Sequence, residues 1–438
     1  MTNIAKPKLV LHIGSHKTGT TALQRSLAKN AINLQEIGEG LFYCLYGRNK
    51  INHISFTCAI INEFISDIHE DHGSMPAKIQ VDHIKKSFFE SGCKTLILSS
   101  EKFSYPFKVK GGLNDNIEKN LNKFLISYVK NHFREFDICV VIYLRRQDDY
   151  LESFYNQTYK NGKTDMRRDV IINNGYLTTS QMHEYINLVR SYGLLNYYDM
   201  LAEWGNVYGK ENIFVRVYER SQMPNGTVYD FYKHVLLIDD IKIESLLSER
   251  NKSNESINKE VMECINAINQ YESCGLSGVE VCSFIKSRSL SLPYNDTKNI
   301  LTAKQASDIL EFYRESNKKV AIEYLQREDG VLFRDKLRDE ADDYKGLTHE
   351  ATFYISREII FLYKEKYKRL REANELFVSE TEALESKNNS LSELKAKLKS
   401  QETKLKNIQN STSWKITKPL RVMTRFLRKI RNRIRRSK

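Results

Sequence analysis

The chain has 438 residues, 41% of them hydrophobic and 28% charged, which provides enough apolar side chains for a substantial core and excludes a disordered protein. The formal net charge is +13, but residues 411–438 contain eleven Lys and Arg and no acidic residue, so the rest of the chain carries only +2 (13 minus 11). The excess of positive charge therefore belongs to a C-terminal tail.

The cysteines and the apolar runs of the sequence indicate the cellular compartment of the protein. The seven cysteines form no CxxC pair and no metal-ligand spacing, as expected for reduced thiols rather than a disulfide framework. The first residues have no basic-then-apolar signal pattern, and no run approaches the ~18 apolar residues that a membrane span needs. We therefore expect a cytoplasmic protein.

The first predicted elements are a strand and a helix joined by a loop with two glycines. Residues 8–14 (KLVLHIG) form a short apolar run that ends in glycine, and a helix-compatible stretch extends from residue 20 to about residue 30. Gly14 and Gly19 have the spacing of the phosphate-binding sequence GxxxxGK[ST]. This unit predicts an anion site, with a tight turn that binds nothing as the alternative.

The loop departs from an ordinary nucleotide P-loop in the position of its lysine. Thr20 and Thr21 follow the second glycine, whereas Lys17 stands two residues before it. Backbone amides at the helix start can still bind an anion. A lysine within the loop can approach the oxygen that bridges two ester groups.

Three further apolar runs predict strands at residues 95–99 (TLILS), 138–144 (ICVVIYL) and 212–218 (NIFVRVY), with helical patterns between them. This alternation predicts an α/β fold with a P-loop-like, largely parallel sheet flanked by helices. Trp204 is expected in the core or at a domain edge rather than as a ligand, as large aromatic residues at helical positions usually are. An amphipathic pattern at residues 302–325 predicts one further helix packed on this domain.

Glu101 follows the strand at residues 95–99 directly, and Arg145 ends the strand at residues 138–144. Ligands of open α/β sheets gather at the carboxyl ends of the strands, so we expect Lys17, Glu101 and Arg145 to meet at one edge. The alternative for Glu101 is a loop carboxylate paired with Lys102 or Lys17.

Ser153 lies eight residues after Arg145, in the predicted helix that follows the strand. An arginine at the end of a strand and a serine on the next helix can converge on one phosphate, through the forked guanidinium and the hydroxyl. The alternative is that Arg145 pairs with Asp148 or Asp149 and that Ser153 is an ordinary surface residue.

Beyond residue 348 the chain is highly charged and has no glycine or proline before Pro419. An apolar residue recurs at every seventh position, as in one seam position of a coiled coil: Tyr363, Leu370, Phe377, Leu384, Leu391, Leu398 and Leu405. The second seam position is polar at Lys366, Glu380, Lys387 and Gln401. We expect a long helix, either in a coiled coil that would support a homodimer or as a solvated spacer.

The basic tail carries apolar residues at spacings of three and four: Ile416, Leu420, Met423, Leu427, Ile430 and Ile434. This pattern favours a helix that lies on an anionic membrane surface, with Trp414 as an interfacial anchor. A partner helix is the alternative, and nucleic acid is disfavoured because a single apolar face has no use on a phosphate backbone. We therefore divide the chain into an α/β domain (1–347), a helical or coiled-coil extension (348–410) and a basic amphipathic tail (411–438).

The sequence K-T-G-T-T after the first strand, together with the later arginine and serine, resembles the sulfotransferase family that uses 3′-phosphoadenosine 5′-phosphosulfate (PAPS). The resemblance covers residues 8–333 and is strongest in these two motifs. It implies that the 5′-phosphosulfate is bound by Lys17, Thr18, Gly19, Thr20 and Thr21. It also implies a 3′-phosphate site formed by Arg145 and Ser153, to which a looser match adds Arg250 or Lys252.

The same resemblance implies two catalytic roles. Glu101 corresponds to the general base that accepts the proton of the acceptor hydroxyl, and Lys17 neutralises the charge that builds on the bridging oxygen. PAPS is then the co-substrate, and the scheme requires no metal.

Two other interpretations are a P-loop kinase and a nucleotide-binding coiled-coil scaffold without catalysis. A kinase P-loop has a lysine directly after its second glycine and the magnesium-binding hydroxyl directly after that lysine, and the order Gly19–Thr20 departs from this pattern. The overall pattern resembles bacterial sulfotransferases, and the tail resembles the SxSWxxTxPLR endings of bacterial polysaccharide glycosyltransferases. These likenesses imply a saccharide acceptor, in a surface polysaccharide or glycolipid, modified at the inner face of the membrane.

Overall fold

The computed structural model describes residues 6–38, 40–45, 51–66, 75–104, 115–160, 195–247, 280, 284, 301–340 and 349–435. The chain divides into two compact units, Met1–Ser356 and Arg357–Lys438.

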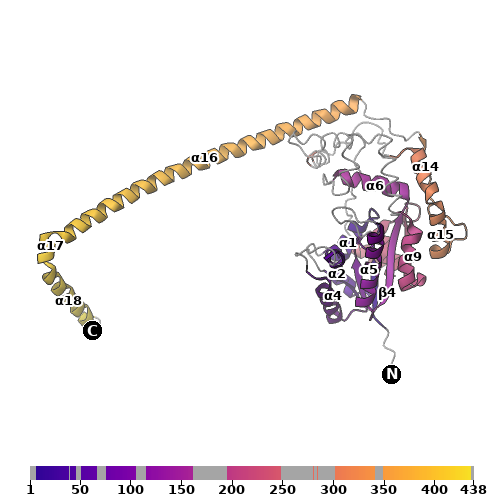
Figure 1. Cartoon of the computed structure of the whole chain (residues 1–438), viewed down its shortest axis with the longest axis horizontal. Coiled ribbons are helices and arrows are strands. Elements are labelled where there is room, and N and C mark those ends of the chain that lie inside the picture. The colour runs from indigo at the N-terminus through magenta and orange to yellow at the C-terminus, as the bar shows by residue number, and fades with distance from the viewer. Residues whose placement is uncertain are drawn as a thin grey trace, which may run out of the picture. The chain divides into compact units, whose positions relative to one another are not determined.

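The first unit is built on a five-stranded parallel sheet in the order β2-β3-β1-β4-β5. Figure 1 labels β4 of this sheet and many of the helices of the unit. The strands are β1 (Lys8–His12), β2 (Leu41–Tyr43), β3 (Thr95–Ser99), β4 (Asp137–Arg145) and β5 (Ile213–Tyr218). The predicted α/β fold with a parallel sheet is therefore confirmed, and four of the strands are the predicted ones. β2 was not expected, because three residues at a sheet edge carry too little periodic signal.

Helices cover both faces of this sheet. They are α1 (Thr20–Lys29), α2 (Ala31–Gln35), α3 (Ile54–Ser66), α4 (Ala77–Ser91), α5 (Asp115–His132), α6 (Gln147–Lys160), α9 (Tyr197–Tyr208), α10 (Gly226–Asp230), α11 (Asp240–Leu246), α14 (Ala303–Phe312) and α15 (Arg314–Leu325). Because neighbouring strand residues point to opposite faces, Leu9 and Leu11 pack in a core with α3, α4, α5, α9, α14 and α15. Val10 packs in the other core, with α1, α2, α10 and α11.

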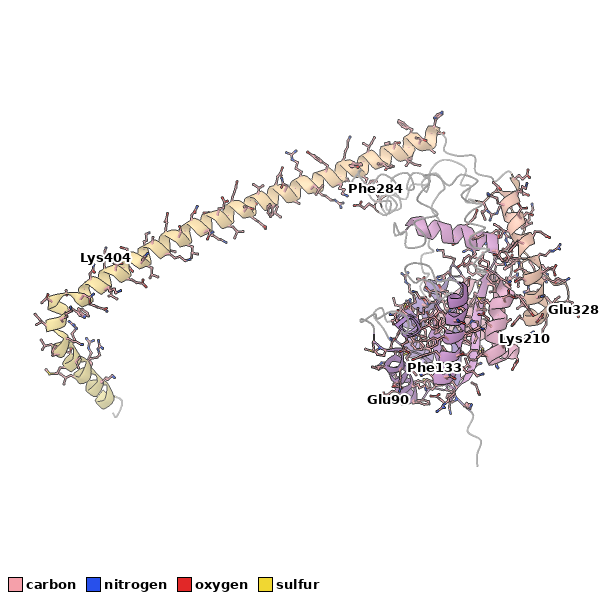
Figure 2. All side chains as sticks on the ribbon, in the orientation of Figure 1. Glu90, Phe133, Lys210, Phe284, Glu328 and Lys404 are labelled. Carbon is pink, nitrogen blue, oxygen red and sulfur yellow. The ribbon has the colours of Figure 1, made fainter. Side chains whose placement is uncertain are left out.

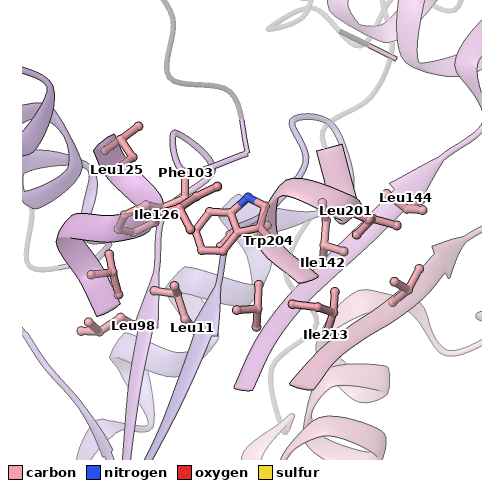
Figure 3. Packing of buried hydrophobic residues seen from close by; sticks show 14 of the residues in the cluster. Leu11, Leu98, Phe103, Leu125, Ile126, Ile142, Leu144, Leu201, Trp204 and Ile213 are labelled. Carbon is pink, nitrogen blue, oxygen red and sulfur yellow. The ribbon is translucent and has the colours of Figure 1, made fainter. Parts of the chain in front are cut away.

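The core position expected for Trp204 is confirmed. Trp204 on α9 is 2% exposed and lies against Leu201 and Phe103 (Figure 3). Its ring meets Phe103 edge-on at 6.4 Å and stacks on Tyr208 at 5.7 Å between centroids. The tryptophan thus joins α9 to the turn that follows β3.

The helix expected at residues 302–325 is two helices, so the prediction of a single helix was wrong. Thr302 begins α14 with a reciprocal capping box to Gln305. Tyr313 then leaves the helical conformation, with φ −95° and ψ 6°, and buries its side chain in the core. The apolar spacing of the sequence continues through this bend, so the pattern alone does not indicate that the helix is interrupted.

The second unit contains most of the expected long helix. α16 (His349–Asn410) has 62 residues, and its side chains project on all sides, Lys404 among them (Figure 2). The residues that repeat every seventh position are 41–68% exposed. The long helix is confirmed, whereas its pairing as a coiled coil and the three-part division of the chain stay predictions.

Two helices follow, α17 (Thr412–Ile416) and α18 (Lys418–Arg435). Ser411 caps α17 by accepting a hydrogen bond from the Trp414 N–H at 3.2 Å. Arg421 on α18 places its guanidinium 3.7 Å from the centre of the Trp414 ring. Within the described part of the chain, no helix has the length and apolar character needed to cross a bilayer.

Candidate functional site

The carboxyl ends of β3, β1 and β4 lie side by side, as their parallel registers require. The chain after β1 remains tied to both neighbours. The Ile13 N–H donates to the Val141 carbonyl on β4 at 3.0 Å, and the Ser104 N–H after β3 donates to the Ile13 carbonyl at 3.3 Å. The loop at residues 13–19 thus begins between the ends of two strands, where ligands of α/β sheets bind.

Gly14 brings this loop into direct contact with Glu101. Gly14 has φ +74°, and a Cβ atom there would lie 2.7 Å from the Cα and 2.8 Å from the Cβ of Glu101. Both its conformation and this contact require glycine. The structure therefore holds Glu101 against the loop that contains Lys17.

Lys17 and Arg145 are joined by a hydrogen bond through the main chain. Lys17 has φ +69°, a left-handed conformation that costs a non-glycine residue about 1–2 kcal/mol. The Arg145 Nη1 atom donates to the Lys17 carbonyl at 2.7 Å, and its guanidinium lies 5.5 Å from the centre of the Tyr218 ring. The arginine at the end of β4 thus stabilises the unusual loop conformation.

The end of the loop is fixed by hydroxyl groups. The Thr18 hydroxyl, which is buried, donates to the Ser15 carbonyl at 2.7 Å. The Thr227 hydroxyl on α10 donates to the Thr18 carbonyl at 2.8 Å, and a Cβ on Gly19 would lie 2.6 Å from that hydroxyl oxygen. Sequence reasoning missed Thr227, because a threonine after an Asn-Gly turn carries no chemical signature.

The first turn of α1 has the properties of an anion site. Gly19 is its N-cap, in the left-handed conformation with φ +81°, and no side chain among the described residues caps the helix. Thr20 is buried and Thr21 exposed. Uncapped backbone amides and the positive end of the helix dipole together attract an anion.

The arginine next in sequence has a different role from Arg145. Arg146 forms two hydrogen bonds to Asp148, of 2.8 and 3.0 Å, and Arg338 donates to the same carboxylate at 3.1 Å. All three side chains are nearly inaccessible, so Asp148 serves a buried ion network. Arg145 instead donates to the loop, as described above.

Two candidate residues remain, Ser153 and Arg250. Ser153 lies on α6, half-buried, in its second turn. Arg250 lies outside the described residues.

Two buried histidines lie beneath the site. Burial lowers the pKa of His12 to about 3 and that of His53 to about 4. The His53 Nδ1 atom accepts the Ser99 N–H at 3.0 Å. In the loop, burial lowers the pKa of His16, an effect that Glu101 opposes and that Lys102 and Lys17 reinforce. The histidines therefore add no positive charge near neutral pH.

The fold defines an α/β protein with a P-loop-like parallel sheet, and the candidate anion site lies at the end of its first strand. No protein-family model matches the chain. An uncharacterized protein of Archaeoglobus fulgidus is 27% identical over 282 residues, which are 63% of this chain and 65% of that protein. The chain thus covers slightly less than two thirds of this relative.

Two solved structures also resemble the chain. A sulfotransferase from Alicyclobacillus acidocaldarius aligns with 61% of this chain and 95% of its own, at 12% identity and a TM-score of 0.31. The sulfotransferase domain of the Synechococcus PCC 7002 olefin synthase aligns with 71% of this chain and 96% of its own, at 14% identity and a TM-score of 0.29. These scores are low, so the function proposed below rests on the chain's own residues.

We predict that Gly14→Ala destabilises the first unit by about 2–4 kcal/mol, because alanine meets both the left-handed φ and the Glu101 backbone. Gly92→Ala is the matched control, since Gly92 has φ +69° but nothing within 4 Å of a Cβ, and should cost only about 1–2 kcal/mol. Urea unfolding of both variants measures the difference. Equal costs would show that the loop does not press against Glu101.

We also predict that stability falls on acidification below the ordinary histidine pKa. The unfolded chain protonates His12 and His53 below about pH 6.5, whereas the folded chain does so only near their lowered values of about 3 and about 4. Their contribution is complete above pH 6.5 and decreases by up to about 2.7 kcal/mol per pH unit below it. Urea unfolding gives the free energy of unfolding at each pH between 7 and 5. Its slope against pH should be smaller for His53→Gln than for the unaltered chain, whereas His83→Asn, which replaces an exposed histidine, should leave the slope unchanged.

Proposed function

We propose that this protein transfers a sulfuryl group from PAPS to a hydroxyl of a saccharide acceptor. The observation that carries the proposal is the loop at residues 13–19. It combines an uncapped helix start with Lys17, and it contacts both Glu101 and Arg145. This combination provides a site for a phosphosulfate, a cation for the leaving group and a carboxylate for the acceptor.

The donor would bind with its 5′-phosphosulfate at the first turn of α1, where backbone amides of Gly19, Thr20 and Thr21 favour an anion. Lys17 would approach the bridging oxygen. Arg145 would serve the 3′-phosphate through its remaining donors, together with Ser153 on α6 and Arg250.

The reaction moves one sulfuryl group in line between two oxygens. The acceptor oxygen forms a bond to sulfur, while the bond between sulfur and the bridging oxygen breaks. The hydroxyl proton passes to Glu101, and the electron pair remains on the 5′-phosphate of adenosine 3′,5′-bisphosphate, where Lys17 balances its charge. The protein contributes placement and charge stabilisation, so the scheme needs no metal.

The alternatives are a P-loop kinase and a scaffold that binds nucleotide without catalysis. A kinase P-loop has its lysine and then the magnesium-binding hydroxyl directly after the second glycine, whereas here Lys17 precedes Gly19 and Thr20 follows it. A scaffold has no need of a carboxylate held against its phosphate loop. The contact between Gly14 and Glu101 therefore favours the enzyme.

The acceptor is proposed to be a surface polysaccharide or glycolipid, which would place the enzyme on the cytoplasmic face of a membrane. α18 supports this location. Its exposed apolar residues Leu420, Met423 and Leu427 follow helical spacing, and residues 411–438 contain eleven basic residues and no acid. Such a helix binds anionic lipid through both its apolar face and its charge.

We predict that Lys17→Ala slows transfer by about 100-fold or more with little change in bisphosphate affinity, because its charge matters most as the bond to sulfur breaks. Arg145→Ala should weaken bisphosphate binding by at least about tenfold, since it removes a phosphate donor and the bond to the Lys17 carbonyl. Calorimetric titration with adenosine 3′,5′-bisphosphate, and with ATP and magnesium for comparison, measures binding.

The control is Arg25→Ala, which removes one positive charge from an exposed position on α1. It should bind the bisphosphate as the unaltered chain does. Preference of the unaltered chain for ATP with magnesium would overturn the proposed function, and unchanged binding by Arg145→Ala would remove Arg145 from the donor site.

We further predict that the protein sediments with vesicles containing phosphatidylglycerol, less so at high salt, and much less with vesicles of phosphatidylcholine alone. Leu420→Gln combined with Leu427→Gln should release it, because both residues lie on the apolar face. Val422→Gln replaces an equally exposed apolar residue away from that face and should retain binding. If the double variant and Val422→Gln lost vesicle binding equally, or if neither lost it, membrane binding by this face would be contradicted.

A further inference from the structure

A buried glutamine lies behind the candidate base. Gln24 on α1 is 1% exposed, and its Nε2 atom donates to Glu101 Oε2 at 3.0 Å and to the Ser99 hydroxyl oxygen at 3.1 Å. Its Oε1 atom accepts a hydrogen bond from Asn52 Nδ2 at 3.3 Å. Both amide protons and the carbonyl of Gln24 are thus engaged, and the proposed reaction assigns this side chain no role.

The direction of these hydrogen bonds is set by the main chain. The Ile54 backbone N–H donates to Asn52 Oδ1 at 3.3 Å. A backbone amide can only donate, so the atom of Asn52 that it meets must be the oxygen. The nitrogen of Asn52 therefore faces Gln24, and the atom of Gln24 that it meets must also be an oxygen. The amide nitrogen of Gln24 therefore faces Glu101.

A further hydrogen bond links Ser99 to the buried histidine. The Ser99 hydroxyl oxygen accepts a hydrogen bond from Gln24 and lies 2.8 Å from His12 Nδ1, where the tautomer of His12 sets which atom donates. Among the described residues, His12 Nε2 has no hydrogen-bond partner, and the His12 ring lies among the rings of Tyr143 and Phe231. The order of donors and acceptors is thus set by the main chain from Ile54 through Asn52 and Gln24 to Glu101.

Glu101 is consequently held at both ends. Its backbone packs against Gly14, and one carboxylate oxygen accepts from Gln24. The amide of Gln24 donates a hydrogen bond to Oε2 without transferring its proton, so Glu101 can remain a carboxylate. Its other oxygen, Oε1, remains for another ligand. Among the described residues, no hydrogen-bond donor to Oε1 is found.

We propose that Gln24, oriented by Asn52, is the positioning residue that turns Oε1 of Glu101 toward the acceptor hydroxyl. The inference rests on the proposed function in that Glu101 is its base. The hydrogen-bond order itself is independent of any reaction and can be measured separately.

The first measurement needs no activity. In a ¹⁵N spectrum, the side-chain amide of Gln24 is identified by its loss in Gln24→Met. Both of its protons should exchange slowly with solvent, and Glu101→Ala should shift one of them. Exchange as fast as that of surface glutamines, or no effect of Glu101→Ala, would overturn the inference whether or not the protein turns over PAPS.

The second measurement separates positioning from binding. Gln24→Met removes the amide, and Asn52→Asp keeps the acceptor for the Ile54 N–H but removes the donor that orients Gln24. Each should lower kcat for PAPS consumption by about 10- to 100-fold, because the base is misplaced, and change KM for PAPS less than about threefold. Bisphosphate binding should be retained, since neither residue belongs to the donor site.

Gln80→Met is the matched control. Gln80 is also a buried glutamine of this unit, 4% exposed on α4, and it donates to the Met75 carbonyl away from the loop. It should leave kcat and KM unchanged. Equal loss of kcat in Gln80→Met, or unchanged kcat in Gln24→Met, would show that Gln24 is merely structural. Failure of the unaltered chain to bind the bisphosphate would instead overturn the proposed function.

Discussion

The close contact between Gly14 and Glu101 is the constraint on which the candidate site depends. Parallel strands bring the segments after β1 and β3 to one edge, but a side chain on Gly14 would keep them apart. Glycine lets the two backbones touch, and this contact determines both the path of the loop and the position of the carboxylate. The left-handed conformation of Lys17, held by Arg145, then directs the loop into α1.

Two adjacent arginines at the end of β4 show that residues of the same type can have different partners. Arg145 is the last residue of β4, and Arg146 directly follows the strand. Arg145 donates a hydrogen bond to the loop, where its positive charge would stabilise a bound anion. Arg146 enters a buried network with Asp148 and Arg338, in which its charge is neutralised. Of these two arginines, Arg145 is the one that contacts the loop of the proposed anion site.

Much of the fold could be predicted from the sequence, because four strands are continuous apolar runs and the long helix α16 contains no glycine or proline. The meeting of Lys17, Glu101 and Arg145 followed from the rule that ligands gather at the ends of parallel strands. The bend at Tyr313 and the short strand β2 did not follow, since neither interrupts or extends a periodic pattern. Thr227 was missed because its contact joins segments 209 residues apart.

The hydrogen-bond order around Gln24 was inaccessible to sequence reasoning for a related reason. Asn52, Gln24 and Glu101 belong to three separate segments, and an amide side chain has no fixed direction until its partners are known. The fold supplies that direction from one backbone N–H, at Ile54, and transmits it through two amides to the carboxylate. The orientation of the candidate base is thus determined by the start of α3, a helix that contributes no residue to the loop itself.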